Sequence, residues 1–60
     1  MTAEAKLQAE SNLRFYMRRA SQERQAAARA ITPAARERHE LLANRFRAQI
    51  EEVQALFQAA

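Results

Sequence analysis

The sequence predicts an all-α protein, an antiparallel two-helix hairpin over about residues 3–30 and 33–58, in a single domain spanning residues 1–60. Three observations predict this fold. The chain has one proline and no glycine, so Ile31-Thr32-Pro33, near its midpoint, is the one evident place to turn. Its fifteen alanines favour helix. Apolar residues recur at three- and four-residue spacing on both sides of the break.

The first helix is predicted to begin after Thr2, whose hydroxyl can cap it, with Glu4 close to the positive helix end. Arg24 interrupts the apolar stripe and can lay its aliphatic stem along it. Before Leu13 the pattern is weak, so we expect the first turns to fray. The stripe consists of Leu13, Tyr16, Met17, Ala20, Ala27 and Ile31.

The second helix is predicted to begin at Pro33. Thr32 precedes a proline, which favours an extended backbone, and from that geometry its hydroxyl can cap the next helix. Pro33 then occupies the first helical position, where a missing N–H costs nothing. The stripe of this helix consists of Ala35, His39, Leu42, Ala43, Phe46, Ile50, Val53, Leu56 and Phe57.

One long helix kinked at Pro33 is the alternative, because the two stripes differ in phase by only about 60°. A proline inside a helix costs about 3 kcal/mol, whereas Thr-Pro serves well as a cap, so the hairpin is favoured. In the hairpin, residues whose numbers add up to about 64 should face each other. The expected pairs are Met17 with Phe46, Leu13 with Ile50, Ala20 with Ala43, and Leu7 near Phe57.

Ion pairs are also expected along the helices, each contributing a few tenths of a kcal/mol. Charged residues of opposite sign stand four apart at Glu10–Arg14, Arg19–Glu23, Arg36–Glu40 and Arg47–Glu51.

The small supply of large apolar residues indicates self-association. The chain has 14 apolar residues larger than alanine. So small a set supplies little hydrophobic burial to offset the conformational entropy lost when the backbone is ordered. Phe15 and Leu41 lie off the stripes, which implies a second apolar surface. We therefore expect a homodimer, a four-helix bundle with coiled-coil packing, or docking on a protein partner, with Phe15, Leu41 and Tyr16 as candidate contacts.

No catalytic, cofactor-binding or metal-binding residue is predicted, and we expect that the chain is not an enzyme. It lacks cysteine, aspartate and glycine, and its one histidine, His39, is expected near Arg24 and Glu40 as a packing residue of the stripe. No apolar run approaches the length of a membrane span. The N-terminal residues lack the features of a signal peptide. We expect a cytoplasmic protein.

Five arginines are expected to ring the middle of the rod, and we call them the arginine belt. With Phe15 for stacking, they could bind nucleic acid. The net charge is only +3, and the aromatic repetition of single-strand binders is missing, which favours the protein-partner interpretation. The belt consists of Arg14, Arg18, Arg19, Arg45 and Arg47.

Three motifs carry a resemblance: Phe15-Tyr16-Met17-Arg18-Arg19-Ala20 followed by Glu23-Arg24, the Thr32-Pro33 break, and His39 followed by Leu42-Ala43-Asn44-Arg45-Phe46. Over about residues 14–47 the chain resembles a group of very short, uncharacterised bacterial helical-hairpin proteins. The resemblance implies the hairpin and no activity. In architecture alone the chain is similar to the Rop type of RNA-regulating dimeric hairpin, which makes RNA binding the alternative function.

Overall fold

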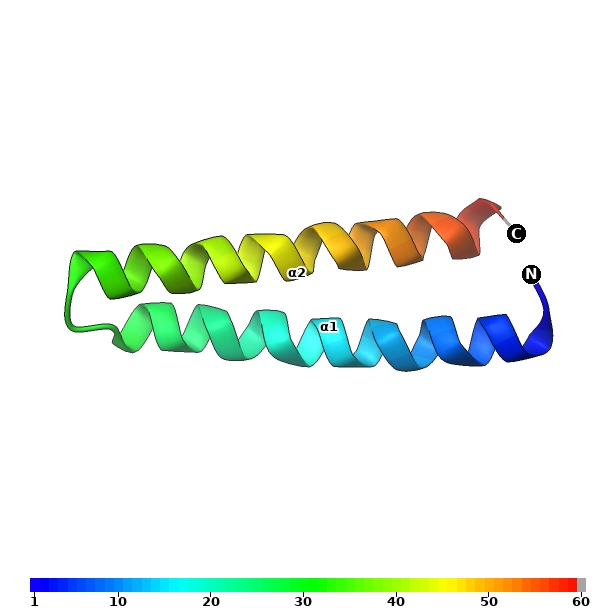
Figure 1. Cartoon of the computed structure of the whole chain (residues 1–60), viewed down its shortest axis with the longest axis horizontal. Helices are drawn as coiled ribbons and strands as arrows, with labels where there is room; N and C mark the ends of the chain where they lie inside the picture. Colours follow the sequence, from blue (N-terminus) through cyan, green and yellow to red (C-terminus); the bar gives the residue numbers. More distant parts are fainter. Residues whose placement is uncertain (60) are drawn as a thin grey trace.

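The computed structural model, which describes residues 1–59, is a hairpin of two helices of equal length. Helix α1 spans Ala3–Arg29 and helix α2 spans Pro33–Ala59. They lie side by side and antiparallel, with both termini at one end of the rod (Figure 1). The Cα atoms extend over 45 × 16 × 11 Å. The predicted all-α hairpin is therefore confirmed.

Both predicted helix caps are confirmed. At the start of α1, the amide of Ala5 donates to Thr2 Oγ1 at 3.0 Å. At the start of α2, the amide of Ala35 donates to Thr32 Oγ1 at 3.1 Å. Helix α1 ends one residue earlier than predicted, because Ala30 is extended, with φ −65° and ψ 134°. The turn is thus a helix stop directly followed by an N-cap.

Replacing Thr32 with alanine should lower the free energy of unfolding by about 1 kcal/mol, because the amide of Ala35 loses its side-chain acceptor. Thr32→Ser is the matched control, since it keeps the hydroxyl and should stay within about 0.5 kcal/mol of the parent. Urea unfolding followed by circular dichroism measures both. Equal losses for the two variants would contradict the capping role.

The interior of the rod is narrow and is built from small side chains. The buried apolar residues are Ala20 and Ala27 on α1 with Ala43 and Val53 on α2. Within residues 1–59 no large side chain is fully buried. The two helices thus approach closely at alanines, while the larger apolar side chains, Val53 aside, stay partly exposed.

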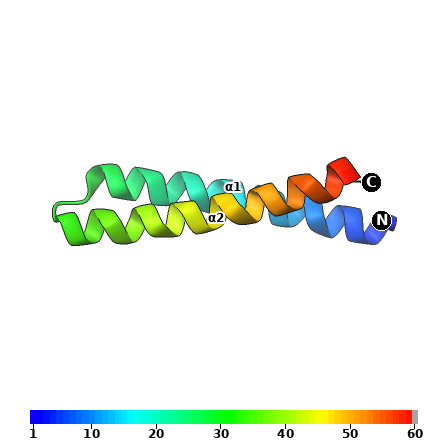
Figure 2. The same cartoon turned by 90° about the horizontal axis from the view of Figure 1, so that it is seen from above.

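The pairing of the helices differs slightly from the predicted one. The cross-helix contacts join Glu23 to His39 and Tyr16 to Phe46, so facing residue numbers add up to about 62 rather than 64. Seen from above, the two ribbons cross at a shallow angle (Figure 2). The contact follows a seven-residue repeat, with Tyr16 and Glu23 in one row of α1 and Ala20 and Ala27 in the other.

Several residues of the predicted stripes are exposed instead. Met17 is 53% exposed, and the residue that meets Phe46 is Tyr16, which lies about 100° from Met17 around α1. Ile31 is 97% exposed because the helix has already ended. Leu56 is also mostly exposed, as is Leu7, the residue expected near Phe57. The contact on α2 instead runs through Val53, the buried residue one turn before Leu56.

Candidate interaction surfaces

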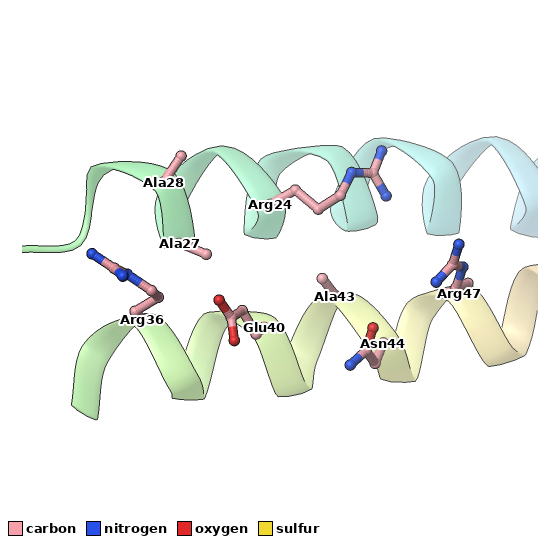
Figure 3. Close-up of a pocket in the computed structure, with 8 residues that line it drawn as sticks. All are labelled: Arg24, Ala27, Ala28, Arg36, Glu40, Ala43, Asn44 and Arg47. Carbon is pink, nitrogen blue, oxygen red and sulfur yellow. The ribbon is translucent and has the colours of Figure 1, made fainter. Parts of the chain in front are cut away.

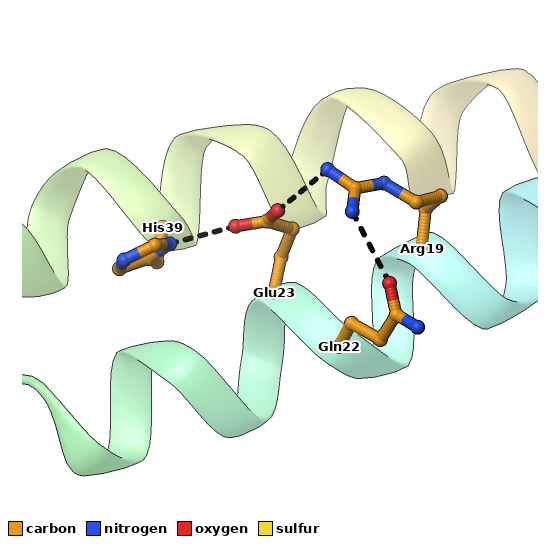
Figure 4. Close-up of polar contacts among 4 residues, drawn as sticks. All are labelled: Arg19, Gln22, Glu23 and His39. Carbon is orange, nitrogen blue, oxygen red and sulfur yellow. Dashed lines mark hydrogen bonds and ion pairs between the residues drawn. The ribbon is translucent and has the colours of Figure 1, made fainter.

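A buried glutamate links the two helices at the centre of the contact. Glu23 is 7% exposed, and both of its carboxylate oxygens are engaged (Figure 4). Arg19 Nη2 donates to Oε2 at 2.9 Å, and His39 Nδ1 lies 2.7 Å from Oε1 across the helix contact. Since a carboxylate only accepts, His39 carries its proton on Nδ1. Arg19 also donates to Gln22 Oε1 at 3.2 Å.

This network corrects the predicted place of His39. The sequence pattern put His39 beside Arg24 and Glu40, but its partner is Glu23. Residues 23 and 24 lie about 100° apart on the helix, and the seven-residue repeat turns Glu23, not Arg24, toward α2. Of the four expected ion pairs at four-residue spacing, Arg19–Glu23 is formed; the other three are absent within residues 1–59.

The network joins the two helices through a single carboxylate. Both Glu23 oxygens are occupied, and the one histidine faces a carboxylate that already has a cationic partner. Within residues 1–59 no group of three or more potential metal ligands comes together. A buried polar pair that is satisfied in only one alignment disfavours sliding of one helix along the other.

A double-mutant cycle should detect this cross-helix link. Glu23→Ala and His39→Ala should each lower the free energy of unfolding, and their effects should be coupled by about 1 kcal/mol, the net value of one hydrogen bond. Glu40, a solvent-facing neighbour of His39, provides the control: Glu40→Ala combined with Glu23→Ala should be additive. If the losses of free energy of unfolding in Glu23→Ala and His39→Ala were additive in the double variant, the link between Glu23 and His39 would be contradicted.

Three aromatic rings, from Phe15, Tyr16 and Phe46, cluster beside Arg19. The ring of Phe46 lies 6.3 Å from the rings of both Phe15 and Tyr16, and Phe15 meets Tyr16 at 5.8 Å in an edge-to-face arrangement. The Arg19 guanidinium carbon stands 5.4 Å from the Phe46 ring centroid, a cation–π contact. Phe15 was expected to face away from α2, yet its ring reaches across to Phe46 while the residue stays 48% exposed.

Further apolar residues extend this cluster along α2. Leu42, Gln49 and Leu56 recur every seven residues in one row, about 40° to 80° from Phe46 on the side away from Arg47. Leu56 also borders a shallow hollow at the open end of the rod, with Met1, Ala5 and Ala9. We call this side the aromatic face and define it by Phe15, Tyr16, Leu42, Phe46 and Leu56. Leu41 is 66% exposed and borders this face on the outer side of α2.

The arginine belt does not form a single surface. Arg14 and Arg18 lie on the outer side of α1, and Arg45 and Arg47 are separated by about 200° around α2. The fifth member, Arg19, is held by Glu23 and the Phe46 ring. The five residues surround the rod at mid-height, but they point in different directions.

A second set of arginines lines a groove on the side opposite the aromatic face. Its floor is formed by Ala27 and Ala43, which point between the helices, while Ala28 lies at its outer edge on α1 (Figure 3). Its volume is about 740 Å³. Arg24 enters it from α1, about 180° around that helix from Phe15. The remaining lining residues belong to α2 and are Arg36, Glu40, Asn44 and Arg47. We call this the arginine groove.

The sequence pattern did not single out the arginine groove. The α2 side of the groove could have been recognised from the spacing of its residues. Three- and four-residue steps place residues 36, 40, 44 and 47 on one face of α2. The contribution of Arg24 depends on which side of α1 faces that row, and this follows only from the pairing of the helices.

The chain matches no family model, no curated protein and no solved structure. The resemblance to short bacterial hairpin proteins therefore stays a prediction. Neither α1 nor α2, as described, combines the length and apolar character that crossing a membrane requires.

Proposed function

We propose that this chain is a small, non-enzymatic interaction module that acts by self-association. Two hairpins pack their aromatic faces together into a four-helix bundle with coiled-coil packing. One observation carries the proposal: within residues 1–59 no large side chain is fully buried, and Phe15 and Leu56 of the aromatic face stay 48% and 54% exposed. A hairpin whose large apolar side chains stay partly exposed gains stability by covering that side.

The dimensions of the rod suit such a contact. Its broad side measures 45 by 16 Å between Cα atoms, which projects to about 700 Å². A stable interface removes about 800 Å² from each partner, about a sixth of the 4775 Å² surface of this chain. The area of one side of the rod is thus close to the area that such an interface requires.

A second copy fits the aromatic face because the residues along α2 are self-complementary. If α2 packs antiparallel on its copy about Gln49, Leu42 meets Leu56 of the second copy, and Leu56 meets Leu42. Along the border of the face, Arg45 then lies opposite Glu52 of the second copy. Leucines thus meet on either side of a central pair of Gln49 side chains, and opposite charges meet at the edge.

Concentration-dependent unfolding tests this proposal. The melting temperature of a dimer should rise as protein concentration increases from about 1 to about 100 µM, because association is part of folding. Phe15→Glu should remove this dependence, since it places a charge in the aromatic face. Met17→Glu is the matched control: Met17 is equally exposed but lies about 200° from Phe15 around α1, so the dependence should remain.

Because Phe15 also touches Phe46, its replacement can weaken the hairpin itself. Leu56→Glu is the second variant, since Leu56 lies outside the aromatic cluster and is mostly exposed. It too should remove the concentration dependence while the chain stays helical. A melting temperature of the parent chain that does not change with concentration would overturn the proposal.

The alternative is a Rop-like hairpin that binds RNA through the arginine belt. It has weaker support, because Arg19 is engaged by Glu23 and the other belt arginines point in different directions. We place the module in the bacterial cytoplasm, since a chain without cysteine does not depend on an oxidising compartment for its stability.

A further inference from the structure

We propose that the arginine groove binds a linear phosphate polyanion, of which a nucleic acid backbone is one source and inorganic polyphosphate the other. The groove lies on the side opposite the aromatic face, so this inference does not depend on self-association. It rests on the charges and the shape of the groove.

The groove holds three guanidinium groups without a close counter-ion. Arg24, Arg36 and Arg47 line it from both helices. The ion pairs found in residues 1–59 involve Arg19 and His39 with Glu23, and neither includes a groove arginine. Glu40 lines the same groove but lies beyond ion-pair distance from all three. The groove thus carries an excess of positive charge, with Asn44 as a further donor.

The spacing of these arginines fits a chain of phosphates better than a single one. Arg36 and Arg47 are eleven residues apart on α2, or about 16 Å along the helix axis, and the pairing of the helices sets Arg24 between them. Guanidinium groups bind phosphate through paired N–H donors, which favours arginine over lysine in this role.

The floor of the groove indicates recognition of a backbone and not of bases. Ala27 and Ala43 allow close approach but provide no aromatic ring on which a base could stack. Phosphate contacts of this kind position a strand without reading its sequence. We therefore expect binding that is tolerant of sequence and strongly dependent on salt.

Fluorescence anisotropy with a labelled single-stranded RNA, a labelled RNA duplex and a polyphosphate chain tests the proposal. With three phosphate contacts per chain, log K should fall with log salt at a slope of about −2 to −3 for nucleic acid. Arg36→Gln or Arg47→Gln should weaken binding and reduce the slope by about 0.7–0.9. Arg45→Gln is the matched control, because Arg45 points away from the groove and should leave the slope almost unchanged.

Glu40 makes the test specific to this groove. Its carboxylate lies among the arginines and repels a phosphate, so Glu40→Gln should tighten binding severalfold. Glu37→Gln makes the same chemical change at a residue outside the groove lining and should have a smaller effect. Affinity for RNA but not polyphosphate, or the reverse, identifies the source of the phosphates. No binding to any of the three probes at low salt would overturn the proposal. Equal losses of affinity in Arg45→Gln and Arg47→Gln would also overturn it, as would tighter binding of the parent chain to polyglutamate than to RNA and polyphosphate.

Discussion

Replacing Phe46 with alanine should lower the free energy of unfolding by about 3 kcal/mol, the largest effect expected from truncating any one side chain. Phe46 is the ring that both Phe15 and Tyr16 contact, and Arg19 lies over it. Its removal therefore separates α1 from α2 at mid-rod and takes away three partners at once. The half-buried state of Phe46 places the loss at the lower end of the range for phenylalanine in a core.

Urea unfolding followed by circular dichroism measures this loss at a fixed protein concentration. Met17→Ala is the matched control, because the sequence pattern placed Met17 opposite Phe46, while the structure leaves it 53% exposed. That variant should cost less than about 1 kcal/mol. A Met17 loss equal to the Phe46 loss would contradict the observed pairing of the helices and favour the predicted one.

Enlarging Ala20 to leucine should cost about 1–3 kcal/mol, since the residue is 1% exposed at the closest part of the helix contact. Leucine is nearly as good a helix former as alanine, so the cost reflects packing rather than helix propensity. The added side chain must push α2 away or adopt a strained rotamer.

Ala48→Leu separates packing from propensity, because Ala48 is exposed on α2. It should change the free energy of unfolding by less than about 0.5 kcal/mol. Thermal unfolding of both variants at equal concentration gives the comparison. A stabilising Ala20→Leu would mean that the helices do not approach through alanines and would contradict the described interior.

The fold could be predicted because its decisive signals are local. Thr32 and Pro33 specify a cap and a helix start through their own chemistry, and Thr2 does the same for α1. These signals depend on a few neighbouring residues and not on the partner helix. The turn accordingly lies where the sequence predicts it.

The buried glutamate could not be recognised in the same way. Glu23 looks like a solvent residue because a charged side chain is rarely buried alone. What allows its burial is a pair of partners, Arg19 one turn away and His39 on the other helix. The first partner is visible as four-residue spacing, but the second depends on a pairing that the apolar pattern predicted about two residues off.

The sequence indicates the aromatic face but not the arginine groove. Phe15 and Leu41 indicated a second apolar surface because they lie off the stripes, although Phe15 reaches Phe46 after all. The arginine groove combines Arg24 of α1 with Arg36 and Arg47 of α2, a combination that arises only when the two helices are placed together. Charges counted along the sequence therefore indicated a belt and missed the groove.

The molar mass of the parent chain in solution tests self-association most directly. Sedimentation equilibrium at tens of micromolar should give about twice the 6.9 kDa of one chain. Phe15→Glu under the same conditions should give the mass of one chain. A parent chain that is fully helical and sediments at 6.9 kDa over the whole concentration range would contradict the proposed four-helix bundle.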